Sequence, residues 1–238
     1  MTIRALVFDV DGTLAETEEI HRAAFNEAFA EAGMGWSWDR ELYRDLLRTT
    51  GGHERILDYA RRVGAVVNPS ALHRRKTEIY NERIRGGMVT LRPGVATLLD
   101  HARREHLAIA IATTTSRPNV VSLLESTLGP ESLGWFASIR TGEDVRAKKP
   151  DPEVYHLVLA DLALSAAECL CFEDSRPGLL AARAAGLRTI VTPSIYTAGD
   201  NFGGALLVIR DLEAPWSSAE GSLQKGLRAI ATYRHSYL

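Results

Sequence analysis

Short apolar runs alternate with longer amphipathic stretches along most of the chain. The runs have the length of buried strands, and they lie at residues 6–8, 107–111, 137–140, 169–172, 189–191 and 206–209. The stretches between the later runs have helical periodicity and lie at residues 93–102, 118–128, 151–162 and 177–185. Strands that alternate with helices predict an α/β fold of three layers, in which a doubly wound parallel sheet carries helices on both faces. One more helix is expected after Trp216.

Residues 15–88 interrupt this alternation, because they show helical patterns and no convincing strand. Four helices are predicted there, at residues 18–32, 39–47, 53–63 and 70–85. The first strand precedes this stretch and the other strands follow it. We therefore expect residues 1–14 and 89–238 to form one α/β core, and residues 15–88 to form an inserted α-helical cap over the strand ends.

The composition is ordinary for a globular protein and argues against several kinds of partner. The chain has 238 residues, of which 45% are hydrophobic and 24% are charged, and its formal net charge is −2. This charge gives no electrostatic reason for binding nucleic acid or an acidic membrane, so we expect neither partner. No signal peptide or membrane span is visible, and we expect a cytoplasmic monomer.

The two cysteines, Cys169 and Cys171, lie two residues apart in a strand-like run. We expect their side chains to point to opposite faces of the sheet, so that a disulfide between them would be strained. This pattern favours a reduced chain, as is usual in the cytoplasm.

The first apolar run ends in the sequence Asp9-Val10-Asp11-Gly12-Thr13. Residues two apart in an extended chain share one face, so Asp9 and Asp11 are expected to lie close together. Like charges at that range repel unless a cation or a shared proton intervenes. Because open α/β sheets bind ligands at the ends of their strands, the pattern favours a metal-assisted carboxylate site. Taken alone, an ordinary pair of aspartates in a strand-to-turn segment fits the residues equally well.

Later strands are also followed by distinct polar residues. Thr113 follows the second predicted strand, and Glu173-Asp174 form a second acidic pair after the strand that ends at residue 172. Lys149 precedes Pro150, which restricts its backbone to extended conformations. Carboxylates from two strand ends suit Mg²⁺ better than zinc or copper. A hydroxyl, an ammonium and a metal that meet at one point are what a phosphoryl group in transfer requires.

Taken in order, these residues resemble the four motifs of the haloacid dehalogenase-like phosphohydrolases. The motifs are Asp9-Val10-Asp11-Gly12-Thr13, Thr113, Lys149-Pro150 and Glu173-Asp174, and the resemblance covers nearly the whole chain. The insertion lies where members of this superfamily carry an α-helical cap. Within the superfamily the chain is similar to the β-phosphoglucomutase-like branch, and more narrowly to the CbbY-type sugar bisphosphatases. The narrower similarity rests on residues 15–21, 49–55, 113–116, 172–175 and 191–194.

The resemblance implies catalytic roles for four residues of the core. Asp9 would attack phosphorus and form an aspartyl-phosphate. Asp11 would protonate the departing sugar oxygen and then take a proton from the attacking water. Thr113 and Lys149 would hold the oxygens of the phosphoryl group in transfer.

The resemblance also implies one Mg²⁺ ion and a substrate site shared with the cap. The metal would be held by the Asp9 carboxylate, the Asp11 backbone carbonyl and Asp174. Glu173 would support the metal directly or through water, although a purely structural role before the next helix is equally consistent with the sequence. The residues that the resemblance assigns to substrate binding are Glu16, His21, Arg55, Lys76, Thr114 and Ser116.

The function that the resemblance implies is Mg²⁺-dependent hydrolysis of a small sugar bisphosphate. Xylulose 1,5-bisphosphate, an inhibitor of the Calvin-cycle enzyme Rubisco, is the specific substrate expected. A first alternative is a sugar-phosphate mutase on the same scaffold, which must keep water away from its phospho-aspartate. A second alternative is a non-catalytic sugar-phosphate sensor, which could dispense with Asp9 or Asp11, whereas this chain retains both.

Overall fold

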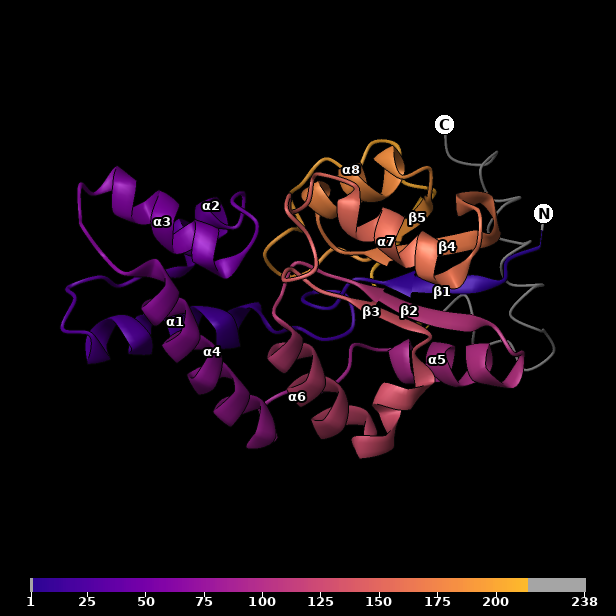
Figure 1. Cartoon of the computed structure of the whole chain (residues 1–238), viewed down its shortest axis with the longest axis horizontal. Helices are drawn as coiled ribbons and strands as arrows, with labels where there is room; N and C mark the ends of the chain where they lie inside the picture. The colour runs from indigo at the N-terminus through magenta and orange to yellow at the C-terminus, as the bar shows by residue number, and fades with distance from the viewer. Residues whose placement is uncertain (1, 214–238) are drawn as a thin grey trace.

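A computed structural model describes residues 2–213 and places an α/β core beside a separate group of helices (Figure 1). Six parallel strands form one sheet in the spatial order β3-β2-β1-β4-β5-β6. The strands are Ala5–Phe8 (β1), Ala108–Ala112 (β2), Ser138–Arg140 (β3), Cys169–Glu173 (β4), Arg188–Val191 (β5) and Leu207–Val208 (β6). The predicted doubly wound parallel sheet is therefore confirmed. The helix predicted after Trp216 lies outside the described residues.

In the described part of the chain four helices cover the two faces of the sheet, and this explains the apolar strand sequences. One face carries α5 (Val95–Arg104) and α6 (Arg117–Leu128), and the other carries α7 (Glu153–Leu162) and α8 (Arg176–Ala184) (Figure 1). Side chains alternate between faces along a strand, so Leu6 packs toward α5 and α6 while Val7 packs toward α7 and α8. Because both faces are buried, β1 needs an apolar residue at every position.

Cys169 and Cys171 lie on the same face of β4, in the apolar cluster beneath α7 and α8. The prediction that they point to opposite faces is wrong, because side chains two residues apart on a strand share a face. Both thiols are free and buried. Their α-carbons are roughly 6.5–7 Å apart in an extended strand, which is the upper limit for a disulfide.

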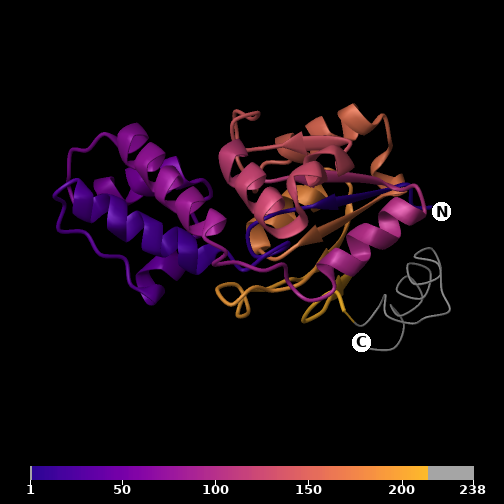
Figure 2. The same cartoon turned by 90° about the horizontal axis from the view of Figure 1, so that it is seen from below.

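The helices of residues 15–88, which we call the cap, lie beyond the carboxyl ends of the strands (Figures 1 and 2). They are Glu18–Glu31 (α1), Arg40–Leu46 (α2), Gly52–Arg62 (α3) and Pro69–Arg85 (α4). The cap has its own hydrophobic centre, in which Phe25, Trp38 and Tyr43 are fully buried. An isolated bridge between Ala15 and Leu91 joins the two chain segments that cross between cap and core. The division at residues 15 and 88 stays a prediction.

The elements begin and end within two residues of their predicted limits, because turn and capping residues define them locally. Asp39 was expected to start the second cap helix, and its carboxylate accepts a hydrogen bond from Leu42 N at 2.8 Å. Gly186 ends α8 with a positive φ of 81°. Within residues 2–213, no helix combines the length and the apolar character needed to cross a lipid bilayer.

Candidate active site

The site lies at the carboxyl ends of β1 and its neighbours β2 and β4, where the order in which the chain adds strands to the sheet reverses. Phe8, the last residue of β1, is level with Ile111 of β2 and Phe172 of β4. The residues that follow these positions therefore meet at one edge of the sheet. They include Asp9, Thr113, Glu173 and Asp174, all of which are buried. The topology thus brings together the core residues that the sequence analysis selected.

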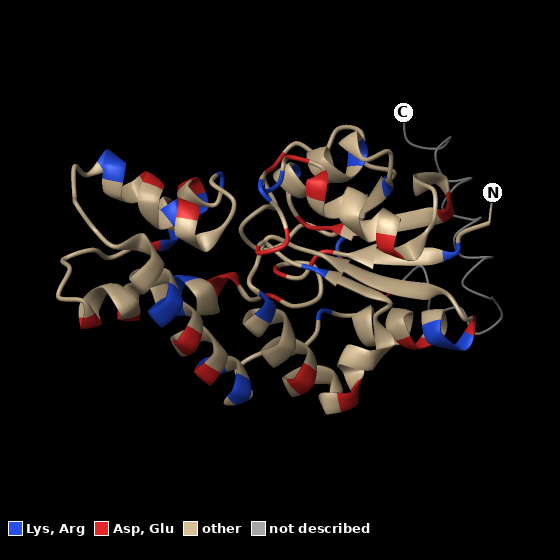
Figure 3. Ribbon diagram, in the orientation of Figure 1, with Lys and Arg blue, Asp and Glu red and all other residues tan. Residues whose placement is uncertain are grey.

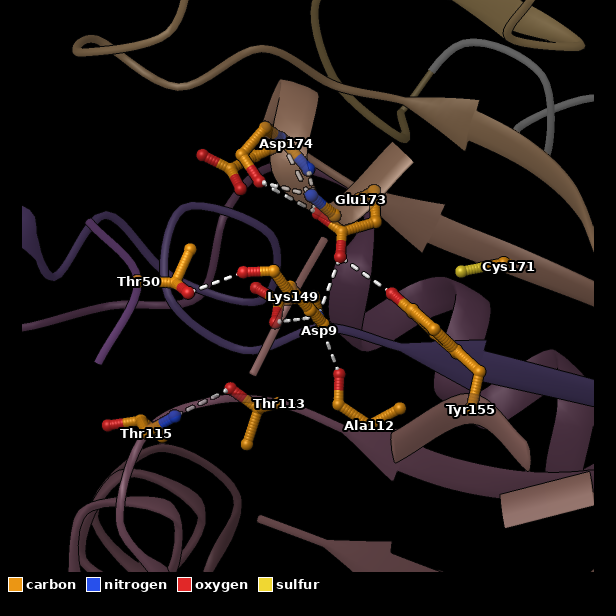
Figure 4. A network of polar contacts seen from close by, with 12 residues as sticks. Asp9, Thr50, Ala112, Thr113, Thr115, Lys149, Tyr155, Cys171, Glu173 and Asp174 are labelled. Atoms are coloured by element: carbon orange, nitrogen blue, oxygen red, sulfur yellow. Dashed lines mark hydrogen bonds and ion pairs between the residues drawn. The ribbon is translucent and has the colours of Figure 1, made fainter. Parts of the chain in front are cut away.

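Lys149 is the centre of the polar network at this edge (Figure 4). Its Nζ donates to Asp9 Oδ1 at 2.7 Å, to Glu173 Oε1 at 2.7 Å and to the Ala112 carbonyl at 2.8 Å. Burial alone would lower the pKa of Lys149, but the charges of Asp9 and Glu173 outweigh burial and raise this pKa above its usual value. Lys149 is therefore a permanent cation with fixed geometry.

Glu173 is the most deeply buried carboxylate of this network, with no exposed surface. Its Oε1 also accepts a hydrogen bond from the Tyr155 hydroxyl at 2.6 Å, and its Oε2 accepts one from Asp174 N at 3.1 Å. A Cβ at Gly178 would lie 2.0 Å from Glu173 Cδ, so only glycine fits there. These contacts support the structural role that the sequence allowed, whereas a metal contact of Glu173 stays a prediction.

Three carboxylates in this network have the arrangement and the charge of a cation site. Asp9, Glu173 and Asp174 each offer an oxygen within 4.8 Å of the others. When all are ionised, three negative charges face the single positive charge of Lys149. Burial, together with the neighbouring carboxylates, raises the pKa of Asp174 well above its usual value. For Asp9, burial outweighs the opposing effect of Lys149 and raises the pKa to about 7.

The backbone also makes room for this group, because Gly12 has a φ of +80° and lies against Asp174. A Cβ at Gly12 would lie 2.2 Å from Asp174 Oδ2. A divalent cation would relieve the repulsion between the carboxylates and lower both raised pKa values. The oxygen-only side-chain donors therefore fit Mg²⁺.

Asp11 points away from this acidic group and toward the cap. Its Oδ1 accepts a hydrogen bond from Thr17 Oγ1 at 2.6 Å and lies 3.0 Å from His21 Nε2. Burial would raise the pKa of Asp11, but the contacts with His21 and Thr17 outweigh it and hold this pKa well below its usual value. Asp11 is therefore a carboxylate in the resting site.

His21 connects Asp11 to a buried lysine of α4. Lys76 Nζ lies 2.6 Å from His21 Nδ1, and the Tyr80 ring stacks on the imidazole with centroids 4.0 Å apart. When Lys76 is an ammonium it can only donate, so His21 then accepts at Nδ1 and carries its proton on Nε2, facing Asp11. Burial and the nearby Lys76 lower the pKa of His21, so the imidazole is neutral. Burial also lowers the pKa of Lys76 itself, to about 7.

A cavity of ≈ 740 Å³ separates the core network from the cap. Five of the six residues predicted to bind substrate line it, namely His21, Arg55, Lys76, Thr114 and Ser116. Glu16, the sixth, does not line this cavity. It lies in the segment that enters the cap, with Oε1 3.6 Å from Arg92 Nε, and its contact with the substrate stays a prediction.

Arg55 and Lys76 are buried inside the cap, whereas charged residues on helices are usually solvated. Their exposed fractions are 8% and 3%. Arg55 Nε donates to the Leu46 carbonyl and Arg55 Nη1 to the Tyr43 hydroxyl, both at 3.1 Å. Buried cations on a cavity wall are costly to maintain without a function, so both residues stay candidates for contact with an anionic substrate.

Several contacts between cap and core could not be predicted from the sequence. Thr50 Oγ1 donates to the carbonyl of Lys149, and Lys148 Nζ lies 3.4 Å from Glu54 Oε2. Charged residues of both signs lie on the loops where the two parts meet (Figure 3). In the sequence, only the adjacent Lys148 and Lys149 indicated such contacts. A threonine or a glutamate near the start of a helix has many ordinary roles.

Comparison with known proteins identifies the family. Residues 6–192 match the family described as haloacid dehalogenase-like hydrolase. The protein CbbY of Rhodobacter capsulatus is 50% identical over 222 residues, which is 92% of this chain and 98% of that protein. The plasmid-encoded CbbY of Cupriavidus necator is 48% identical over 221 residues, which is 90% of this chain and 87% of that protein.

Solved structures agree with this assignment. The crystal structure of CbbY from Rhodobacter sphaeroides in complex with phosphate has a TM-score of 0.86 and 44% identity, and the match covers 90% of this chain and 96% of that one. A mutant of the same protein in complex with xylulose 1,5-bisphosphate matches with the same values. The chain therefore belongs to the haloacid dehalogenase-like hydrolases, and it is a phosphatase of that family similar to the CbbY proteins.

Proposed function

We propose that this phosphatase is Mg²⁺-dependent and hydrolyses a small sugar bisphosphate, with xylulose 1,5-bisphosphate as the best candidate. One observation carries the proposal: a single cavity joins a buried Asp9–Lys149–Asp174 group in the core to buried cations in the cap. The core group is suited to a phosphate in transfer, and the cap can neutralise a second phosphate. The CbbY mutant structure with xylulose 1,5-bisphosphate supports the choice of substrate.

Asp9 is the proposed nucleophile. Its carboxylate attacks phosphorus, a bond forms between Asp9 and phosphorus, and the bond between phosphorus and the sugar oxygen breaks. Water then attacks the phospho-aspartate, which releases inorganic phosphate and restores Asp9. Lys149 and Thr113 hold the phosphoryl oxygens during both steps. A bound Mg²⁺ would neutralise charge on these oxygens and favour the ionised form of Asp9.

Asp11 is the proposed acid and base. It gives a proton to the sugar oxygen in the first step and takes a proton from the attacking water in the second. The contacts with His21 and Thr17 keep Asp11 ionised in the resting site, which is the form that can take a proton in the second step. In the first step, the negative charge of a bound phosphate raises the pKa of Asp11 and favours the acid form. His21 holds Asp11 toward the cavity throughout.

The test is to follow both phosphate and sugar products across sugar monophosphates and bisphosphates in Mg²⁺. We expect one inorganic phosphate for each substrate consumed, with a sugar bisphosphate as the best substrate. An isomeric sugar phosphate formed without free phosphate would show a mutase instead. Binding without turnover of any sugar phosphate would show a sensor.

A further inference from the structure

Tyr196 is a residue of the core whose side chain is buried in the cap. It lies in the loop after β5 and is 5% exposed. Its ring meets that of Tyr43 edge-on, with centroids 5.5 Å apart. Among the described residues, every other member of this hydrophobic cluster comes from residues 25–72. The core therefore inserts one aromatic ring into the hydrophobic centre of the cap.

The hydroxyl of Tyr196 makes a second contact with the cap. It donates to Glu19 Oε1 at the start of α1. The same carboxylate accepts from Arg22 Nη2 at 2.9 Å and from Arg40 Nε at 3.0 Å. Burial opposes ionisation of Glu19, but these three hydrogen bonds outweigh it and lower its pKa to about 2. The acceptor is therefore charged at neutral pH, which strengthens the bond to Tyr196.

The loop that carries Tyr196 is also fixed to the proposed metal site. Thr197 Oγ1 donates to the Asp174 carbonyl at 2.7 Å and accepts from Ser194 N at 2.8 Å. Arg92, in the segment that returns from the cap, donates to the Pro193 carbonyl at 2.9 Å. Tyr196 thus projects from a turn that is bonded to Asp174 and to a linker of the cap.

Tyr196 lines the cavity itself, and through Tyr43 it is connected to Arg55, which lines the cavity from the cap. The Tyr43 hydroxyl donates to Glu18 Oε2 at 2.7 Å and accepts from Arg55 Nη1 at 3.1 Å. The Arg55 guanidinium also lies over the Tyr43 ring, 5.2 Å from its centroid. Any shift of Tyr43 would therefore move Arg55 relative to the core.

We propose that Tyr196 is a positioning residue that anchors the cap on the core and thereby sets the distance from Arg55 to Asp9. This inference rests on the proposed function, because a fixed distance matters only for a substrate with groups at both ends. In the described residues two chain segments connect cap and core, and α4 of the cap packs against α6 of the core. Interfaces between domains of one chain commonly permit relative motion. The anchor restricts that motion at the wall of the cavity where the second phosphate would lie.

A double-mutant cycle tests the anchor. Tyr196→Phe and Glu19→Leu, which removes the acceptor, should each lower kcat/KM for xylulose 1,5-bisphosphate about tenfold, the loss of one charge-assisted hydrogen bond. The double variant should lose no more than either single variant, because both remove the same bond. With p-nitrophenyl phosphate, which cannot reach the cap, each loss should stay below about twofold. Additive losses, or equal losses on both substrates, would overturn the proposal.

Two matched controls separate anchoring from cap stability. Arg40→Gln removes a donor to the same Glu19 oxygen, but the contact lies within the cap. Tyr59→Phe removes a hydroxyl from a tyrosine that packs edge-on against Trp36 and Trp38 and does not line the cavity. Both variants should keep kcat/KM for the two substrates within about twofold. A tenfold selective loss in either control would contradict a specific role for Tyr196.

Hydrogen exchange provides a measurement that does not depend on activity. In Mg²⁺, Tyr196→Phe should speed amide exchange in residues 194–197 and in the first turn of α1, whereas Tyr59→Phe should not. Unchanged exchange in Tyr196→Phe would overturn the anchor. Failure of the proposed function would instead appear in the wild-type enzyme, as absence of phosphate release from every sugar bisphosphate.

Discussion

The charged groups of the core and those of the cap are held in different ways. Lys149, Asp9 and Glu173 extend from strand ends and loops whose backbone is fixed by the sheet, and Lys149 also bonds to the backbone of β2. In the cap, Lys76 and His21 are held mainly by other side chains on separate helices. The core network is therefore fixed by contacts with both backbone and side chains, and it suits a step that all substrates share. The cap network can vary with small changes of helix packing, and it suits the selection of a substrate.

The largest effect should come from replacing the proposed nucleophile, Asp9. Asp9→Asn should abolish turnover of every phosphate ester, because an amide is a poor nucleophile and a poor metal ligand. Folding should survive, since the change is isosteric and removes one negative charge from a crowded site. Phosphate-release assays and circular dichroism measure both results. Wild-type rates in purified Asp9→Asn would refute the assignment of chemistry to the core.

Replacing a glycine that contacts the core network should have the next largest effect. Gly178→Ala would place a Cβ 2.0 Å from Glu173 Cδ and displace the partner of Lys149. We expect a loss of about 1–3 kcal/mol in the free energy of unfolding and at least about a tenfold loss of kcat on all substrates. Gly134→Ala is the control, because no atom lies within 4 Å of a Cβ there. Similar denaturation midpoints and rates for the two variants would contradict a tightly fixed core network.

The two buried cations of the cap should separate into different roles. Arg55→Ala should lower kcat/KM about 10- to 150-fold for a sugar bisphosphate and hardly at all for p-nitrophenyl phosphate, as expected for a charge-assisted contact. Lys76→Met should lower kcat on both substrates, because Lys76 acts on Asp11 through His21. Equal losses from Arg55→Ala on both substrates would remove the cap from substrate selection.

The smallest effect should be the pH dependence of the increase in Tm that Mg²⁺ causes. The pKa of Asp9 rises to about 7 on folding, so without metal its stabilising contribution is complete below pH 4 and is lost as the pH rises through 7. Asp174 shifts in the same direction. Saturating Mg²⁺ should therefore raise Tm more at pH 8 than at pH 5, by roughly 2–8 °C for about 1–2 kcal/mol. Scanning calorimetry with Mg²⁺ and with chelator measures this difference.

Asp9→Asn is the matched control for the metal measurement, because it removes one of the titrating carboxylates. Its Tm shift with Mg²⁺ should be smaller and should depend less on pH. An equal shift at pH 5 and pH 8 in the wild-type protein would contradict the linkage between the metal and these carboxylates.

The same contrast explains what the sequence could predict. Asp9, Thr113 and Glu173 could be placed because residues after adjacent parallel strands must meet at one edge of a sheet. Tyr155, whose hydroxyl donates to Glu173, could not be placed in the site from the sequence. An aromatic residue on the buried face of a helix has the pattern of an ordinary core residue. The burial of Arg55 could not be predicted either, because it depends on how separate helices of the cap pack together, and a local sequence pattern does not predict that packing.

The most direct test of the account is to detect the phosphoryl group on Asp9 itself. The enzyme would be mixed with excess xylulose 1,5-bisphosphate and Mg²⁺, quenched in acid during turnover, and digested for mass spectrometry of the peptide that contains Asp9. The account predicts that this peptide gains the mass of one phosphoryl group, that the gain depends on Mg²⁺, and that Asp9→Asn lacks it. Phosphate release at the full rate with no phosphoryl group on Asp9 would contradict the account.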